Sequence, residues 1–299
     1  MLEVARAVAE ALRPRWDASL VAVDADLHHV ALRLRELRPA CVFNLCESIA
    51  GDARLESALP MILEGLGIRY TGSPPAALAL ALHKDRVKKA LRAAKVPTPA
   101  GGLYQIGMKV RWPAIVKPSR EDGSSGICAA SVVRSESALR GQVRRIEREF
   151  RQPALVEEYV DGLELNVSVL GHPPRALPPW AIDFSVMPAG SPKIVTYDGK
   201  WKPGSLADRG SKPVRASLDR ATERAVVAVA LAAFRAVGLR DYGRVDVRLA
   251  ADGTPFVIDV NPNCDLSPSA GFARAAAAAG LSYAALVDRI TSLGRRRRG

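Results

Sequence analysis

The chain reads GRVDV at residues 243–247 and FVIDVNPN at residues 256–263, with an Asp-Gly pair at 252–253 between them. Alternation around such a pair predicts a β-hairpin. Side chains two positions apart share a face of a strand, so Arg244 should lie beside Asp246, and Asp259 beside Asn261. Two carboxylates and an amide suit magnesium, and the arginine suits phosphate oxygens. The alternative is a solvated hairpin face without a ligand.

Size and charge narrow the class of protein. The 299 residues are enough for two or three compact domains, and the net charge is +12. Arginines are spread over many predicted helices, and only Arg295 to Arg298 form a run, which we expect to be a frayed tail with incidental polyanion affinity. Basic residues are not interleaved with aromatic ones, so no specific nucleic-acid partner is expected.

The N-terminus and the cysteines indicate in which cellular compartment the protein is expected. No signal-peptide pattern opens the chain and no apolar stretch is long enough to cross a bilayer, so we expect a cytoplasmic protein without a membrane partner. The spacing of the four cysteines fits neither a disulfide framework nor a paired metal site. We expect reduced, mostly buried thiols at Cys41, Cys46, Cys128 and Cys264.

Hydrophobic patterning predicts an α/β chain in three sections. Residues 1–83 alternate between strands and helices and should form an open layer with a parallel sheet. The segment Val96-Pro97-Thr98-Pro99 follows a helix and is typical of a domain boundary. Outside the hairpin, the predicted strands cover residues 20–23, 40–45, 68–72, 114–117, 127–133 and 155–160, and the predicted helices cover residues 4–12, 28–37, 55–67, 84–95, 139–150 and 283–293.

Two central segments carry candidate nucleotide chemistry. The strand PAIVKP ends near Lys117 and runs into SREDGSSG at 119–126, where a cation and freely oriented backbone N–H groups could hold a polyphosphate. A plain turn is the alternative, and the GxxxxGK[ST] pattern of Walker-type sites is missing. The strand at 155–160 leads into clustered acids that suit an adenine edge and ribose hydroxyls, although a solvated strand end would look the same.

The order and spacing of these segments resemble the ATP-grasp superfamily, and within it the D-alanine-D-alanine ligases. The resemblance rests on VFNL at 42, GIRYTGS at 67, HKDRVKKALRAAKVPTP at 83, IVKPSREDGSSGI at 115, LVEEYVDGLELNVSVLG at 155, TYDGKW at 196 and the hairpin. It implies an α/β fold of three domains: an N-terminal substrate domain at 1–83, a central lid at 84–160, and a C-terminal catalytic domain with a basic tail at 161–299. ATP would lie between the central and C-terminal domains.

The resemblance also implies roles for residues at matching positions. Phosphates of ATP would contact Lys84, Lys117 and the loop residues Ser124 and Ser125; adenine and ribose would contact Glu157, Tyr159, Val160 and Glu164; Mg²⁺ would be held by Asp246, Asp259 and Asn261; and Arg244 and Lys200 would lie near the transferred phosphoryl group. The implied activity is an ATP- and magnesium-dependent carboxylate-amine ligase that forms an acylphosphate. The alternatives are a ligase for other small amino acids or peptides and a catalytically silent nucleotide-binding protein. A homodimer is a possible assembly.

Several departures concern the substrates. Glu47-Ser48 stands where the dipeptide ligases have a His-Gly pair, and Glu47 is either a partner for a substrate ammonium or an exposed strand-end carboxylate. Lys200 is followed by Trp201 instead of a tyrosine, so a network through a hydroxyl is not expected there. Residues 262–269 also differ from the glycine- and threonine-rich substrate turn, and Asp259 replaces a glutamate. The chain opens on a helix where the resembling ligases begin with a strand, so we expect residues upstream of Met1 to be missing.

Overall fold

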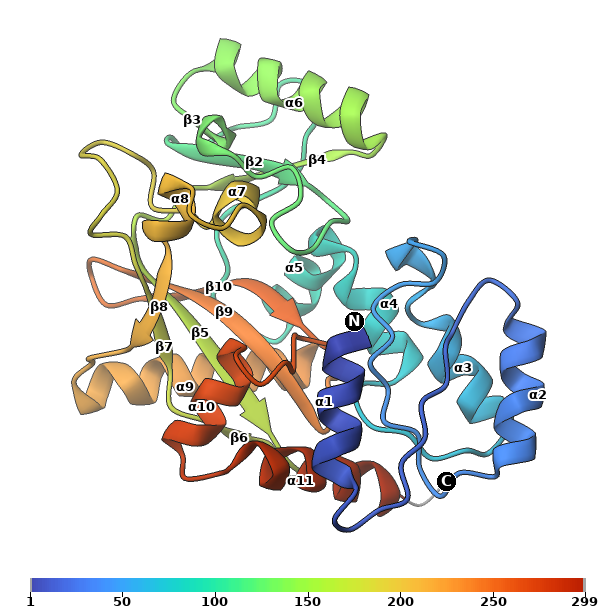
Figure 1. Cartoon of the computed structure of the whole chain (residues 1–299). Coiled ribbons are helices and arrows are strands. Elements are labelled where there is room, and N and C mark those ends of the chain that lie inside the picture. The colour runs from blue at the N-terminus through green and yellow to red at the C-terminus, as the bar shows by residue number, and fades with distance from the viewer. Residues whose placement is uncertain (1, 298–299) are drawn as a thin grey trace.

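The structure, a computed structural model, describes residues 2–297 and contains two antiparallel sheets stacked one above the other (Figure 1). The smaller sheet has four strands in the order β1-β4-β2-β3, and helix α6 (Glu136–Phe150) covers one of its faces. Its strands are β1 (Gly101–Leu103), β2 (Ala114–Pro118), β3 (Val132–Val133) and β4 (Ala154–Glu158). The predicted helix at 139–150 and the strand at 114–117 are confirmed.

The larger sheet has six strands, five of them in the order β10-β9-β5-β7-β8. They are β5 (Gly162–Leu170), β6 (Arg175–Ala176) paired to β5, β7 (Trp180–Asp183), β8 (Lys212–Arg215), β9 (Tyr242–Ala250) and β10 (Pro255–Asn261). One face packs on α9 (Arg220–Ala236) and α5 (Lys84–Ala93), and the other on α10 (Gly271–Ala278) and α11 (Tyr283–Arg295). On β5, Leu165, Val167 and Val169 alternate into the α9 core and are fully buried.

The first section is mostly helical. Its elements are α1 (Leu2–Leu12), α2 (Leu27–Leu37), η1 (Ala53–Leu55), α3 (Ala58–Gly65) and α4 (Pro75–Ala81). Pro60 lies in the first turn of α3, where a missing N–H is tolerated. The predicted parallel sheet is reduced to one parallel bridge between Val42 and Tyr70. The predicted strand at 20–23 is wrong: Leu20 is 52% exposed, and an apolar run with no neighbouring strand cannot form a ladder.

The predicted strand at 127–133 is also mostly wrong. The 3-10 helix η2 (Ala129–Ser131) precedes β3, and only Val132–Val133 is extended. A local exchange of hydrogen bonds explains the difference, because the backbone N–H of Cys128 donates to Ser131 Oγ and the Ser131 N–H donates to the Cys128 carbonyl.

The C-terminal arginines are not the frayed tail that the charge run predicts. Arg297 donates to the buried carboxylate of Asp241 at 2.6 Å and to the Tyr70 carbonyl at 2.9 Å. The Arg295 guanidinium lies 5.1 Å from the centre of the Trp16 ring. These contacts join the first and last parts of the chain, while Arg298 lies outside the described residues.

Two further expectations concern the thiols and the membrane. All four cysteines are free, but only Cys264 is buried and the other three are half-buried, so the expectation of mostly buried thiols is wrong. Burial raises the pKa of Cys264 to about 12. Within residues 2–297, none of the helices combines the length and hydropathy needed to span a bilayer.

Candidate active site

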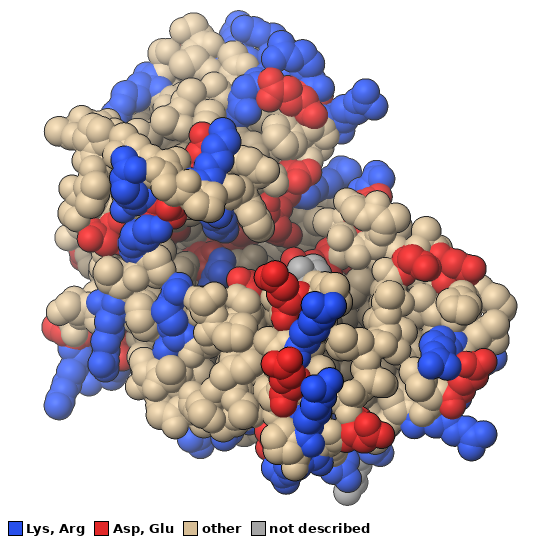
Figure 2. All heavy atoms as spheres, viewed as in Figure 1, with Lys and Arg blue, Asp and Glu red and all other residues tan. Residues whose placement is uncertain are grey.

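A cavity of about 470 Å³ opens between the two sheets and gathers the predicted site residues. Figure 2 shows the molecule hollowed at this level, with acidic and basic side chains inside the hollow. Its lining includes Lys84, Lys117, Ser124, Ser125, Glu157, Tyr159, Val160, Glu164, Lys200, Arg244, Asp246, Asp259 and Asn261. Residues distant in the sequence therefore share one site, and Glu47 is the predicted site residue that stands outside the described lining.

The hairpin of β9 and β10 forms the cavity floor. Asp246 lies opposite Asp259, and Arg244 lies opposite Asn261, so all four side chains share one face as predicted. A β-bulge between Val257 and Asp259 makes this possible. Without the extra residue, Asp259 would share the buried face of Val257, because side chains two positions apart point the same way.

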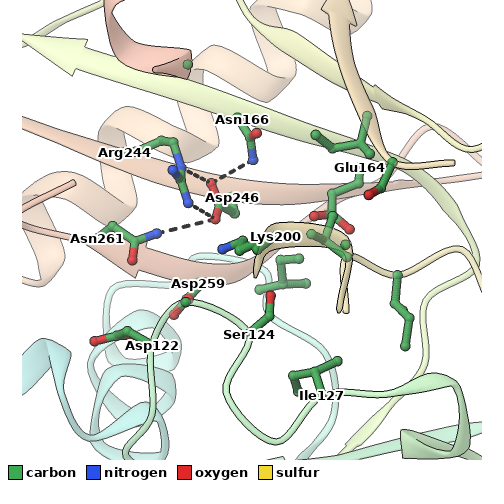
Figure 3. Close-up of a pocket in the computed structure, with 18 of the residues that line it drawn as sticks. Asp122, Ser124, Ile127, Glu164, Asn166, Lys200, Arg244, Asp246, Asp259 and Asn261 are labelled. Atoms are coloured by element: carbon green, nitrogen blue, oxygen red, sulfur yellow. Dashed lines mark hydrogen bonds and ion pairs between the residues drawn. The ribbon is translucent and has the colours of Figure 1, made fainter. Parts of the chain in front are cut away.

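Asp246 is the centre of a polar cluster on this floor (Figure 3). Arg244 binds it in a bidentate manner, with nitrogen to oxygen distances of 2.7 and 2.8 Å. Asn166 on β5 donates to it at 2.9 Å, and Asn261 donates at 3.3 Å. Although burial of the guanidinium opposes ionisation, the Asp246 carboxylate outweighs burial and raises the pKa of Arg244. The arginine is therefore a fixed positive charge in the cavity.

The second carboxylate, Asp259, pairs with Lys84 at the start of α5. The distance between Lys84 Nζ and Asp259 Oδ1 is 3.1 Å, and Asp122 from the loop at 119–126 approaches the same ammonium at 3.3 Å. Burial alone would lower the pKa of Lys84, but the two carboxylates outweigh it and raise the pKa. Burial likewise opposes ionisation of Asp259, and Lys84 and Lys117 more than compensate, so its pKa is lowered.

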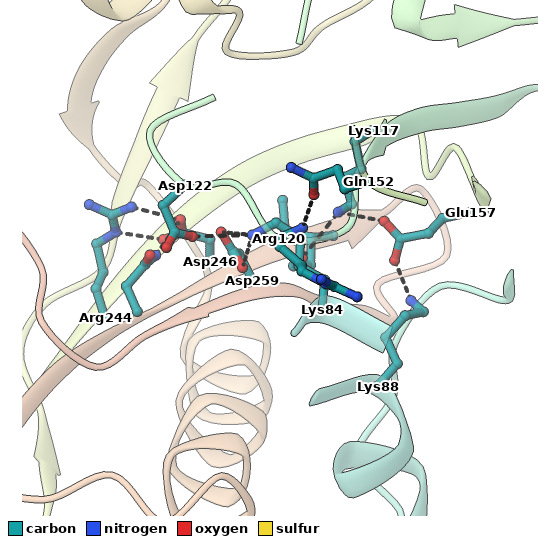
Figure 4. Close-up of polar contacts among 12 residues, drawn as sticks. Lys84, Lys88, Lys117, Arg120, Asp122, Gln152, Glu157, Arg244, Asp246 and Asp259 are labelled. Carbon is teal, nitrogen blue, oxygen red and sulfur yellow. Dashed lines mark hydrogen bonds and ion pairs between the residues drawn. The ribbon is translucent and has the colours of Figure 1, made fainter. Parts of the chain in front are cut away.

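Lys117 belongs to a buried charge cluster with Glu157 and Lys88 (Figure 4). Lys117 Nζ lies 2.5 Å from one oxygen of Glu157, and Lys88 donates to the other oxygen. Burial of Glu157 would raise its pKa, but the two ammonium groups lower it to about 2. This carboxylate therefore holds Lys117 at the cavity wall.

The other wall combines β5, the end of β4 and α7 (Tyr197–Trp201). Glu164 pairs with Arg248 at 2.8 Å, and burial raises the pKa of Glu164 despite that arginine. The Tyr159 hydroxyl accepts a hydrogen bond from the Lys193 N–H at 3.0 Å. From α7, Lys200 extends toward Asp246 (Figure 3), and burial together with Arg244 lowers its pKa.

Four residues at this site were not predicted from the sequence: Lys88, Asp122, Asn166 and Arg248. Periodicity could have identified three of them. Lys88 is one helical turn after Lys84, Asn166 is two positions after Glu164 on β5, and Arg248 is two positions after Asp246 on β9.

Glu47 lies at the border of the cavity, on the first section. It is exposed, and its pKa is raised by desolvation and by the neighbouring carboxylates of Asp265 and Asp122. Asn263 connects this border to the cavity floor, donating to the Cys46 carbonyl at 2.9 Å and to Glu56 at 3.1 Å. The border is therefore acidic, whereas the floor balances acids with cations.

Comparison with known proteins agrees with the geometry. A family model described as the D-ala D-ala ligase C-terminus matches residues 88–292. The chain is 32% identical over 299 residues to a D-alanine–D-alanine ligase of Anaeromyxobacter sp. (strain Fw109-5), covering 97% of this chain and 90% of the relative. It is 34% identical over 260 residues to the uncharacterized protein y4sG of Sinorhizobium fredii (strain NBRC 101917 / NGR234), covering 86% and 75%.

A solved structure supports the fold. The D-alanine–D-alanine ligase from Bacillus anthracis, complexed with ATP, aligns with a TM-score of 0.73 at 20% identity, over 98% of this chain and 93% of that one. The family match and the sequence relatives carry the stronger conclusion, since they span most of the chain. The chain belongs to the D-alanine–D-alanine ligase family of ATP-dependent ligases.

Proposed function

We propose that this protein is an ATP- and magnesium-dependent ligase that joins the carboxylate of one small amino acid or peptide to the amine of another. The observation that carries the proposal is the convergence of Asp246, Asp259 and Asn261 with Lys84 and Lys117 in one cavity. Acidic and amide oxygens beside lysines are the groups that bind a metal-complexed polyphosphate.

The donor set fits magnesium. The candidate ligands are the carboxylates of Asp246 and Asp259 and the amide of Asn261, which share one face of the β9–β10 hairpin. Magnesium usually takes one or two carboxylates and completes its shell with water and phosphate oxygens, so this set is sufficient. When bound, Mg²⁺ would neutralise phosphate charge. Lys84 and Arg244 stand beside the same carboxylates and would face phosphate oxygens themselves.

The cavity also fits ATP in its volume and in the arrangement of the residues that would contact the phosphates, the ribose and the adenine. Its volume of about 470 Å³ lies within the range of small-molecule sites. Lys117, Ser124 and Ser125 would contact phosphates, and Glu157, Tyr159, Val160 and Glu164 would surround adenine and ribose. In this proposal, residues 84–160 form a lid, residues 161–299 form the catalytic domain with ATP between the two, and residues 1–83 complete the substrate site.

The proposed chemistry has two steps. A substrate carboxylate oxygen bonds to the terminal phosphorus of ATP as ADP leaves, and an amine nitrogen then bonds to the acyl carbon as phosphate leaves and the nitrogen loses a proton. Arg244 and Lys200 would stabilise charge on the transferred group, and the loop at 119–126 would exclude water. Loss of one such contact typically costs about 3 kcal/mol in the barrier.

The acidic border of the cavity indicates which kind of substrate the site would favour. The charge of Asp265 helps to raise the pKa of Glu47 there, and Glu47 in turn helps to raise the pKa of Glu56. Carboxylates at this position favour a substrate that carries an ammonium group. We therefore propose amino acids or short peptides, with D-alanine as one candidate among them.

A phosphate-release screen of amino-acid pairs with ATP and Mg²⁺ tests the function. The wild type should release phosphate only with a productive pair, and Asp259→Ala should abolish the release. Asp252→Ala is the matched control, because Asp252 lies at the turn of the same hairpin, where it caps Thr254. ATP binding without turnover across the screen would support the catalytically silent alternative instead.

A further inference from the structure

Two segments from different sheets meet over the cavity and contact each other. One is the loop at 119–126, which follows β2, and the other is α7, which lies between β7 and β8. The Trp201 indole N–H donates to the Gly123 carbonyl at 2.9 Å. One helical turn earlier, the Tyr197 backbone N–H donates to the Ile127 carbonyl at 3.0 Å.

Core packing does not explain Trp201, because its side chain is 59% exposed. Its ring instead covers the face of Gly123 where a side chain would project. A Cβ built on Gly123 would lie 3.4 Å from the indole ring, and Gly123 has a φ of +62°, which disfavours other residues. The tryptophan and the glycine are therefore complementary in shape as well as in hydrogen bonding.

The contact bears directly on the cavity. Gly123, Ser124 and Ser125 line it from the loop, and Lys200, the residue before Trp201, lines it from α7. Although the ammonium of Lys200 is desolvated within the cavity, every residue of α7, which the structure describes in full, keeps part of its surface exposed to solvent. The position of Lys200 therefore depends on contacts at the surface of α7, and the indole provides one of them.

We propose that Trp201 is a positioning residue that fastens α7 to the loop at 119–126 and so holds both segments closed over the cavity. This inference rests on the proposed ligase function for its consequence, which is that a fastened pair of segments keeps water from the acylphosphate and keeps Lys200 in place.

Trypsin cleavage after Arg120, which is exposed within the loop, tests the fastening in the free protein. Trp201→Phe keeps an aromatic ring and removes the N–H. The Arg120 fragment, followed by mass spectrometry, should appear about fivefold faster in Trp201→Phe than in the wild type. Trp112→Phe is the matched control, because Trp112 is 43% exposed and outside the described lining of the cavity, and it should be cleaved at the wild-type rate. Equal cleavage of Trp201→Phe and the wild type would overturn the proposal.

Turnover gives the second readout. Trp201→Phe should release several phosphates for each amide formed, whereas the wild type should release about one, and calorimetric ATP affinity should change less than twofold. An unchanged ratio of phosphate to amide would reject the role in excluding water. A wild type that fails to bind ATP would refute the proposed function, while the cleavage rates would still decide whether Trp201 fastens the two segments.

Discussion

Replacing Glu157 by glutamine should destabilise the fold strongly, because this carboxylate is the shared partner of two buried ammonium groups. The side chains of Glu157, Lys88 and Lys117 are 3%, 5% and 12% exposed, so water cannot replace the lost charge. Glutamine has nearly the same shape and can still accept a hydrogen bond, which confines the change to electrostatics. The two lysines would then repel each other in a poorly solvated site.

Two independent considerations give the magnitude. The pKa of Glu157 falls from an ordinary 4.5 to about 2, which corresponds to about 3 kcal/mol at roughly 1.4 kcal/mol per pKa unit. Removing one partner of a buried ion pair typically costs about 3–5 kcal/mol. We therefore expect Glu157→Gln to lower the free energy of unfolding by about 3 kcal/mol.

Urea unfolding at pH 7 of the wild type, Glu157→Gln, Lys88→Met and the double variant measures this effect. The double variant removes one of the two repelling charges, so the cycle should give a coupling energy of about 2 kcal/mol. Because the folded pKa is depressed, the stabilisation is complete above pH 4.5 and is lost as the pH falls toward 2, and Glu157→Gln should lack this part of the acid dependence. A loss below about 1 kcal/mol, or additive single effects, would refute the reasoning.

Three further outcomes are expected. Asp259→Ala or Asn261→Ala should abolish magnesium-dependent ATP turnover in a protein that still folds, with the larger fall in Tm for Asp259→Ala because it removes a partner of Lys84, and wild-type turnover in either variant would reject the metal assignment. Lys117→Ala should weaken ATP binding by about tenfold or more in calorimetry, in line with a charged hydrogen bond, and unchanged affinity would contradict its phosphate role. Burial raises the pKa of Glu56 to about 8 despite the hydrogen bond from Asn263, so the folded state keeps a proton that the unfolded state loses, and stability falls as the pH rises from 4.5 to 8. Glu56→Gln should remove this fall, and a Tm at pH 8 no higher than that of the wild type would count against it.

The local sequence pattern was sufficient to predict the positions of those site residues that lie on regular strands. The period of two along β9 and the strand that ends near Lys117 placed these residues correctly, because strand geometry fixes where alternate side chains point. The β-bulge beside Asp259 could not be read from the sequence. Uninterrupted alternation would give Val257 and Asp259 the same face, and the bulge appears only when the two strands pair.

Apart from residues 127–133, where a local exchange of hydrogen bonds replaces the predicted strand, the errors concern contacts between distant segments. Residues 20–23 have the composition of a strand, but whether a strand forms depends on a neighbour that local sequence does not specify. Lys88 lies on an otherwise amphipathic helix and is buried because Glu157 meets it from a distant strand. The arginine run is a comparable case, since isolated charge runs are usually solvated, and its partners are far away in the sequence.

The contacts of Arg295 and Arg297 have a consequence for the order in which the protein is completed during synthesis. Arg297 bonds to the Tyr70 carbonyl across 227 positions, and Arg295 lies over Trp16. Ribosomes make the chain from its N-terminus at about 5–20 residues per second, so the first section exists for roughly ten seconds or more before these arginines emerge. During that interval the first section, with its one parallel bridge between Val42 and Tyr70, lacks the contacts with these two arginines. The first section is therefore made first but gains its contacts with Arg295 and Arg297 last.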